Sequence, residues 1–192
     1  NPNLANTYSL RGTAYSRKDQ QDRSRADHDR AIAIYSESIA KKPNDATAHL
    51  YSGFAYFRRG DYDRAITEYS EAIRLNPSAV DAFRSRCWTH AIVGRFTPAL
   101  ADCDEALRLR PAEARTLEGR GFTYLRMGDH DRAIADLDAA LGKSPKRAGA
   151  LFARGVARLR KGDQAGGDAD IAAAAAIEAM VAERYAEYGV RP

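Results

Sequence analysis

Hydrophobic residues recur along this chain at the three- and four-residue spacing that places them on one face of a helix. From Ala46 to about Arg59 the apolar positions include Leu50, Phe54 and Phe57. A second set follows from Asp63 to about Leu75, at Ala65, Ile66, Tyr69, Ala72 and Ile73. The pattern predicts two amphipathic helices with a short turn between them.

The residues between and after these stretches are typical of helix ends. Gly60 is suited to end the first helix, because glycine adopts the left-handed conformation that closes a helix, and Asp61 can cap the next one. Asn76 precedes Pro77, and a residue before proline avoids helical geometry. A helix–turn–helix hairpin is therefore expected between residues 46 and 77.

The same hairpin pattern returns every 34 residues. Gly60–Pro77, Gly94–Pro111 and Gly128–Pro145 share one frame of glycine, aromatic or histidine, alanines and closing proline, and Pro43 continues the series toward the N-terminus. A fixed period of this size indicates stacked repeats. We expect a single array over 1–192, with units at about 5–45, 46–79, 80–113, 114–147 and 148–181, and a capping helix at about 181–188.

The first and last units depart from the period. The first is longer by about two helical turns, with the excess within Ser16–Asp27. Lengthened helices would keep both faces aligned, so they are favoured over a loop. The fifth unit has Gly166 and Gly167 within its second helix and Ala179 in place of the proline, as expected of a terminal repeat.

The repeated frame resembles that of the tetratricopeptide-repeat (TPR) family. The second unit carries the frame at Gly53, Tyr56, Gly60, Ala65, Tyr69, Ala72 and Pro77, and the fourth at Gly121, Tyr124, Gly128, Ala133, Leu137, Ala140 and Pro145. The third unit departs from it, with Cys87 in place of glycine and His90 in place of tyrosine. The resemblance implies an all-α fold, a right-handed α-solenoid of antiparallel helix pairs, and it suggests a bacterial source.

The resemblance also implies a binding groove. In TPR proteins the first helix of each pair, helix A, lines a concave surface in which partner peptides lie. The matching positions give these expected groove residues: Leu50, Phe54, Phe57, Arg58, Arg84, Trp88, Ile92, Arg115, Phe122, Leu125, Arg126 and Phe152.

Three aromatic residues of this set, Phe54, Trp88 and Phe122, lie 34 residues apart. If they share an exposed inner wall, they form an apolar strip of the kind that marks a binding site. The alternative is that they pack against neighbouring A helices and are covered. Binding is favoured, but the pattern alone leaves both interpretations open.

Charge adds to the predicted groove. Counting Arg17 and Arg160, the groove positions hold six arginines against Asp81 and Glu118, a local excess as large as the net charge of +4 of the whole chain. A basic surface with apolar residues suits an acidic and hydrophobic peptide, because arginine binds carboxylates through paired hydrogen bonds.

Composition excludes other classes. The 192 residues are 44% hydrophobic, and no apolar run approaches the ~18 residues of a membrane span. The chain starts at Asn1 rather than Met, so a processed or truncated N-terminus is expected, and the compartment stays open between the cytoplasm and the periplasm or exterior.

Candidate chemistry is sparse. The four histidines, at His28, His49, His90 and His130, take positions held by aromatic residues in other repeats and are expected to pack rather than to bind metal. We find no phosphate-binding loop, zinc motif or nucleophile motif. We therefore expect no catalytic residue, no cofactor and no enzyme.

Other repeated pairs have structural explanations. Cys87 and Cys103 are expected to lie close together as free thiols, a disulfide being the alternative. Ion pairs between helices A and B of one unit are expected for Arg86–Asp102, Arg120–Asp136 and Arg154–Asp170.

The sequence thus predicts a non-enzymatic scaffold or adaptor that binds a protein or peptide in the groove of its A helices. Two alternatives remain: an RNA-binding α-solenoid, in which the aromatic residues would stack on bases, and a self-assembling module. Nucleic acid is disfavoured, and a monomer is favoured over a homo-oligomer.

Overall fold

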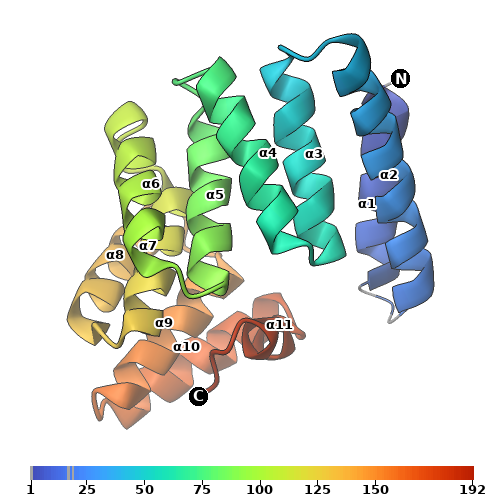
Figure 1. Cartoon of the computed structure of the whole chain (residues 1–192). Coiled ribbons are helices and arrows are strands. Elements are labelled where there is room, and N and C mark those ends of the chain that lie inside the picture. The colour runs from blue at the N-terminus through green and yellow to red at the C-terminus, as the bar shows by residue number, and fades with distance from the viewer. Residues whose placement is uncertain (1, 17, 19) are drawn as a thin grey trace. The chain divides into compact units, whose positions relative to one another are not determined.

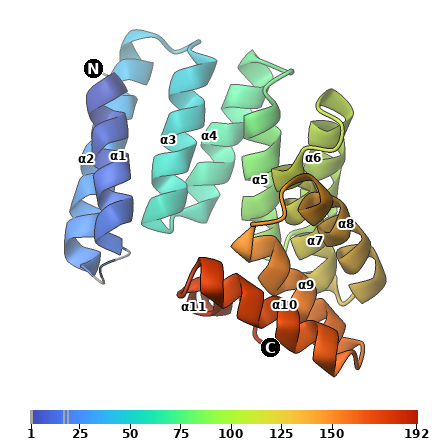
Figure 2. The same ribbon diagram turned by 180° about the vertical axis from the view of Figure 1, so that it is seen from behind.

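The computed structural model describes residues 2–16, 18 and 20–192. The described residues form eleven α-helices and no strand (Figures 1 and 2). The chain divides into two compact units, residues 1–89 and 90–192. The all-α prediction is confirmed, and the helices pair as in an α-solenoid.

The first unit contains four complete helices and most of a fifth: α1 (Pro2–Ser16), α2 (Gln21–Lys41), α3 (Ala46–Arg59), α4 (Tyr62–Leu75) and α5 (Val80–Ile92) as far as Thr89. Helix α1 packs on α2 and α3 on α4, and α1 also contacts α3. In Figure 2, α1 and α3 face the viewer with α2 and α4 behind them. The A helices therefore lie together on one side of this unit.

The second unit starts at His90 and contains six further helices: α6 (Phe96–Leu109), α7 (Ala114–Met127), α8 (His130–Lys143), α9 (Ala148–Arg160), α10 (Gln164–Ile177) and α11 (Val181–Glu187). Helix α7 packs on α8, α9 on α10, and α7 contacts α9. Helix α11 follows α10 after three residues and packs on α9. That all five repeats form one array stays a prediction.

The turn residues act as the sequence predicts. Gly60 ends α3 with a φ of 85°, in the left-handed region that favours glycine. The Asp61 carboxylate then accepts a hydrogen bond from the backbone N–H of Arg64 and caps α4. Gly128 and Asp129 repeat this arrangement between α7 and α8.

Small residues allow the two helices of a pair to approach closely. Ala65 and Ala72 of α4 are fully buried, and the ring of Tyr69 between them packs against Gly53 of α3. A Cβ atom at Gly53 would lie 2.5 Å from this ring, far inside van der Waals contact. In the second unit, Leu137 fills the same place against Gly121.

The extra residues of the first repeat lie in one helix. Helix α2 has 21 residues, whereas α4 has 14. The additional turns precede His28, which occupies the position that Tyr62 holds in the second repeat. The prediction of a lengthened helix is therefore confirmed for α2, while α1 ends at Ser16.

Two of the predicted ion pairs are present, and each joins more than two helices. The Arg120 guanidinium donates two hydrogen bonds to Asp136, at 2.7 and 2.8 Å, and a third to Asp104 on α6 at 2.7 Å. Arg154 likewise binds Asp170 and Asp138. These arginines thus connect the B helices of successive repeats.

The sequence reasoning missed a further pair of this kind. In the first unit, Arg11 donates two hydrogen bonds to Asp27, at 2.6 and 2.8 Å, and holds the pKa of that carboxyl below its usual value. The predicted pairing of Arg86 with Asp102 stays a prediction, and Arg86 donates to Ser70 at 2.8 Å.

His28 is buried between α1 and α2, and its ring packs against Gly12. Its Nδ1 atom has no hydrogen-bond partner among the described residues. Burial lowers the pKa of His28, and the positive charge of Arg58 lowers it further, whereas Asp27 acts in the opposite direction. The folded protein therefore favours the neutral imidazole.

Acidification should consequently destabilise this packing. The unfolded chain takes up a proton at His28 near the ordinary pKa of 6.5, so this contribution to stability is present above that pH and is lost below it. Between about pH 7.5 and about pH 5 we expect the Tm of the wild type to fall more than that of His28→Phe. Differential scanning calorimetry checks this, and equal slopes would show that His28 does not titrate as described.

Candidate binding surface

The A helices of the first unit present four apolar side chains and one arginine, which together we call the first A face: Leu10, Leu50, Tyr51, Phe54 and Arg58. Leu10 of α1 is 65% exposed and Tyr51 of α3 is 41% exposed. Leu50 and Phe54 are half-buried, and Arg58 is exposed. Helices α1 and α3 are in contact, and Leu10 and Tyr51 take equivalent positions in them when Gly12 is aligned with Gly53.

A series of aromatic rings packs against Tyr51 and Phe54 of this face. The ring centroids of Tyr35 and Tyr51 are 6.1 Å apart and stacked, those of Tyr51 and Phe54 are 5.8 Å apart, and those of Phe54 and Tyr69 are 5.7 Å apart. Burial raises the pKa of Tyr35 to about 12. Phe54 is thus held by rings on two sides and is only half-buried, so it both packs and presents surface.

Two residues of the first A face were missing from the sequence prediction. Leu10 and Tyr51 occupy the same position in successive A helices, when Gly12 is aligned with Gly53. The corresponding residues in later repeats are Ser85 and Gly119. The sequence signal for these two positions is a large apolar residue where later copies have a small one.

The other predicted residues of the first unit are partly accessible. Phe57 is half-buried against Tyr62, with ring centroids 5.5 Å apart. Trp88 is half-buried as well. Arg84 has a side chain that is only 16% exposed, and it binds Asp81 at 2.8 Å.

The corresponding aromatic residues of the second unit are covered. Phe122 and Phe152 are both 0% exposed. The ring of Tyr185 on α11 lies 5.6 Å from Phe122 and 5.1 Å from Phe152, centroid to centroid. The expectation that Phe122 and Phe152 line an open wall is therefore wrong for this structure, because α11 packs on them.

A buried carboxylate contacts α11. Glu118 of α7 is 7% exposed, and it accepts a hydrogen bond from the hydroxyl of Tyr185 at 3.3 Å. Arg147 donates to the other carboxylate oxygen through Nε at 2.8 Å. Burial raises the pKa of Tyr185 well above its usual value, so the phenol stays protonated and donates. Gly149 leaves room for this contact, since a Cβ atom there would lie 2.7 Å from the Tyr185 oxygen.

The remaining predicted residues divide between core and surface. Leu125 is 0% exposed, so its placement in an open groove is wrong, whereas Ile92 is half-buried and Arg115 is exposed. The Arg126 guanidinium donates to the backbone carbonyls of Ala91, at 2.8 Å, and Ile92. Burial lowers the pKa of Arg126.

These contacts occupy several of the arginines that the sequence offered to an acidic ligand. Arg84 pairs with Asp81, and the Arg126 guanidinium donates to backbone carbonyls. Arg160 donates to the carbonyl of Arg191 at 3.3 Å, and Arg17 lies outside the described residues. Within the first A face, Arg58 is the arginine, and it is exposed.

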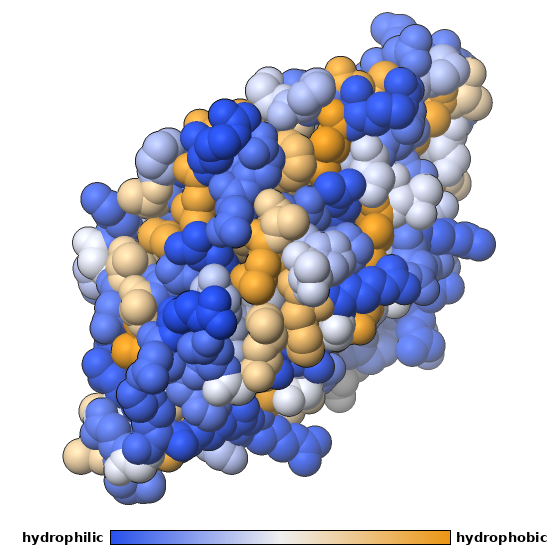
Figure 3. All heavy atoms as spheres, turned by 60° about the vertical axis from the view of Figure 1, so that its left-hand side comes forward, coloured by the Kyte–Doolittle hydropathy of each residue, from blue (hydrophilic) through white to orange (hydrophobic). Residues whose placement is uncertain are grey.

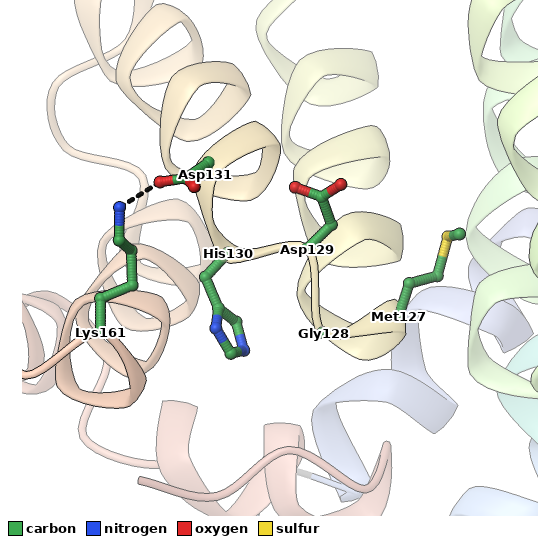
Figure 4. A pocket seen from close by; sticks show the side chains of 6 residues that line it. All are labelled: Met127, Gly128, Asp129, His130, Asp131 and Lys161. Atoms are coloured by element: carbon green, nitrogen blue, oxygen red, sulfur yellow. Dashed lines mark hydrogen bonds and ion pairs between the residues drawn. The ribbon is translucent and has the colours of Figure 1, made fainter.

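An open hollow of about 460 Å³ lies at the turns after α7 and α9, lined by Met127, Gly128, Asp129, His130, Asp131 and Lys161 (Figure 4). Its charges are mutually satisfied, since Lys161 pairs with Asp131 and Asp129 pairs with Arg132. Within the described part of the chain, no group of three or more potential ligands could hold a metal ion. We assign no site to this hollow.

The cysteines differ from expectation. Both Cys87 and Cys103 are disulfide-bonded, and the described residues include no free thiol. The prediction of free thiols is therefore wrong.

On the face drawn in Figure 3, hydrophilic side chains predominate and hydrophobic ones show between them. None of the helices in the described ranges combines the length and the apolar character that crossing a bilayer requires.

The family model described as "TPR repeat" matches residues 53–86, and the model described as "Tetratricopeptide repeat" matches residues 119–184. Together the two matches cover more than half of the chain. No curated protein matches it.

Several solved structures share the fold. MamA is 23% identical, with a TM-score of 0.68 over 88% of this chain and 96% of that one. YrrB, a TPR protein with an unusual peptide-binding site, is 20% identical, with a TM-score of 0.62 over 94% and 90%. A thermophilic TPR protein of Thermus thermophilus is 17% identical, with a TM-score of 0.71 over 96% and 97%.

At these identities the structures establish likeness of fold alone, whereas the two family matches lie on the residues that carry the repeated frame. The chain belongs to the tetratricopeptide-repeat family, whose repeats serve as protein-interaction scaffolds.

Proposed function

We propose that this protein is a non-enzymatic scaffold that binds a hydrophobic and acidic peptide segment of a partner protein on its first A face. The observation that carries the proposal is the exposure of apolar side chains there: Leu10 and Tyr51 remain 65% and 41% exposed, beside the half-buried Phe54. Contiguous exposed apolar residues bordered by polar ones are typical of interaction sites.

The support of this face suits recognition. Tyr51 and Phe54 contact each other and are braced by Tyr35 and Tyr69, so little side-chain entropy is lost when a ligand covers them. Aromatic residues at the centre of an interface commonly provide most of its binding free energy. Exposed Arg58 at the edge would attract a carboxylate and speed association.

The similarity to YrrB is consistent with this role, since a related array carries a peptide-binding site. The proposal extends to the other predicted residues of the first unit: Leu50, Phe57, Arg84 and Trp88. Trp88 is the single tryptophan of the chain, so its fluorescence reports whether a ligand reaches α5.

The test is selection from a displayed random peptide library against the full-length protein. We expect the enriched peptides to combine hydrophobic and acidic residues. Tyr51→Ala and Phe54→Ala should each weaken binding of an enriched peptide by about 2 kcal/mol, because each removes a central ring. Isothermal titration calorimetry measures the loss.

The matched control is a pair of exposed arginines. Arg58→Ala should slow association and reduce its dependence on salt, whereas Arg110→Ala in the second unit should leave both unchanged. If enriched peptides bind the Tyr51→Ala and Phe54→Ala variants as tightly as the wild type, the proposed face is not the site.

A further inference from the structure

The C-terminal segment occupies the A side of the second unit in the manner of a ligand. Tyr185 packs against Phe122 and Phe152, and the ring of Tyr188 lies 6.3 Å from that of Phe122. Val181 and Val190 are each 1% exposed. The segment therefore places two tyrosines, one helical turn apart, on rings that the first unit leaves partly open at the equivalent position, Phe54.

Polar contacts give this docking a defined register. Glu118, held by Arg147, accepts the hydrogen bond of Tyr185. Arg160 donates to the carbonyl of Arg191 beyond the helix. These groups belong to the receiving surface, which we call the second A face: Glu118, Phe122, Arg147, Phe152 and Arg160. The rings of Phe122 and Phe152 select aromatic side chains, and Glu118 selects a hydroxyl group that donates a hydrogen bond.

The segment is held by this surface rather than by its own helix. Helix α11 has only seven residues, too few for a stable helix in isolation. It joins α10 through Glu178, Ala179 and Met180, and the adjoining Ile177 and Met180 are 47% and 51% exposed. The connector is therefore short and exposed, and Glu178 within it pairs with Arg184 of α11.

We propose that the second A face is a docking site for a short partner helix that carries two tyrosines three residues apart, and that residues 178–192 are its resident, displaceable occupant. This inference rests on the proposed function, since it assigns a partner class and a regulation to the A side of the array. The tethered segment has a high local concentration and excludes weak competitors. A partner helix binds when it matches the two-tyrosine pattern and outcompetes the segment.

The experiment uses a fluorescein-labelled synthetic peptide with the sequence of residues 178–192, followed by fluorescence anisotropy with the full chain. The double variant Tyr185→Ala/Tyr188→Ala loosens the resident segment. We expect it to bind the peptide at least about tenfold more tightly than the wild type, because the tethered segment without its two rings competes less well for the second A face. Equal affinity of the two proteins would overturn the proposal.

Two controls define the specificity. A labelled peptide in which both tyrosines are replaced by alanine should bind neither protein. Gly142→Ala, on an exposed part of α8, should behave as the wild type does. Tight binding of the tyrosine-free peptide would also overturn the proposal.

A second arm does not depend on the folding of the double variant. A protease recognition sequence is inserted between Glu178 and Met180, the protein is folded, and the connector is then cleaved. The labelled peptide should displace the cleaved segment. A segment that resists displacement would show a permanent cap and contradict the proposal.

Sedimentation of the wild type should show a monomer. A dimer that the labelled peptide dissociates would assign the face to the tail of a second copy and overturn the partner proposed here. The proposed function is tested on the first A face, with selected peptides and the variants Tyr51→Ala and Phe54→Ala. Either test can therefore fail without the other.

Discussion

Phe122→Ala is expected to lower the free energy of unfolding by about 3–5 kcal/mol, the range for removing a fully buried phenylalanine ring. Phe122 is 0% exposed and contacts Tyr185 and Tyr188. Its loss would leave a cavity between α7 and α11 that neither tyrosine can fill without leaving its position. Chemical denaturation followed by circular dichroism measures the change.

The matched variant is Phe54→Ala, because Phe54 takes the same position two repeats earlier. Phe54 is half-buried, so its removal should cost clearly less stability than that of Phe122. The two variants separate packing from recognition, because Phe54→Ala should weaken partner binding. Equal stability losses would mean that the two rings are buried alike, contrary to the structure.

Gly121→Ala should destabilise the protein by about 1–3 kcal/mol, the usual cost of overpacking a core. A Cβ atom at this position would lie 2.8 Å from Cγ of Leu137 and 3.2 Å from the backbone oxygen of Ala133. Neither atom is at the flexible end of a side chain. Helices α7 and α8 would therefore have to move apart.

Gly142→Ala, in the same helix pair, is the control. A Cβ atom there meets no atom within 4 Å, and the residue is exposed on α8. Alanine favours helix over glycine by up to about 1 kcal/mol, so this variant should be as stable as the wild type or slightly more so. Thermal denaturation of both variants gives the comparison, and a destabilised Gly142→Ala with a neutral Gly121→Ala would contradict the packing described.

The repeat period was sufficient to predict the helices and their turns. Gly60 and Asp61 act locally, through backbone conformation and capping, so their roles can be read from the sequence. The close packing at Gly53 and Gly121 also follows from the frame, because each copy places a small residue opposite a large one.

Which groove positions are exposed and which are buried could not be predicted in this way. Phe54 and Phe122 are equivalent in the repeat, yet Phe122 is covered by α11 whereas Phe54 is half-buried, and the contact with α11 joins residues far apart in the chain. Likewise the charge of Arg126 was counted as free, whereas its guanidinium binds backbone carbonyls. A repeat pattern describes what its copies share, and the ends of the array make them different.

Photo-crosslinking tests the central claim, that the A side of the first unit binds the partner segment, most directly. A peptide enriched against the full-length protein is resynthesised with a benzophenone side chain, irradiated in the complex and mapped by mass spectrometry. We predict crosslinks within α1 and α3, concentrated at Leu10, Tyr51 and Phe54. Crosslinks confined to α2 and α4, on the opposite side of the same helix pairs, would contradict the account.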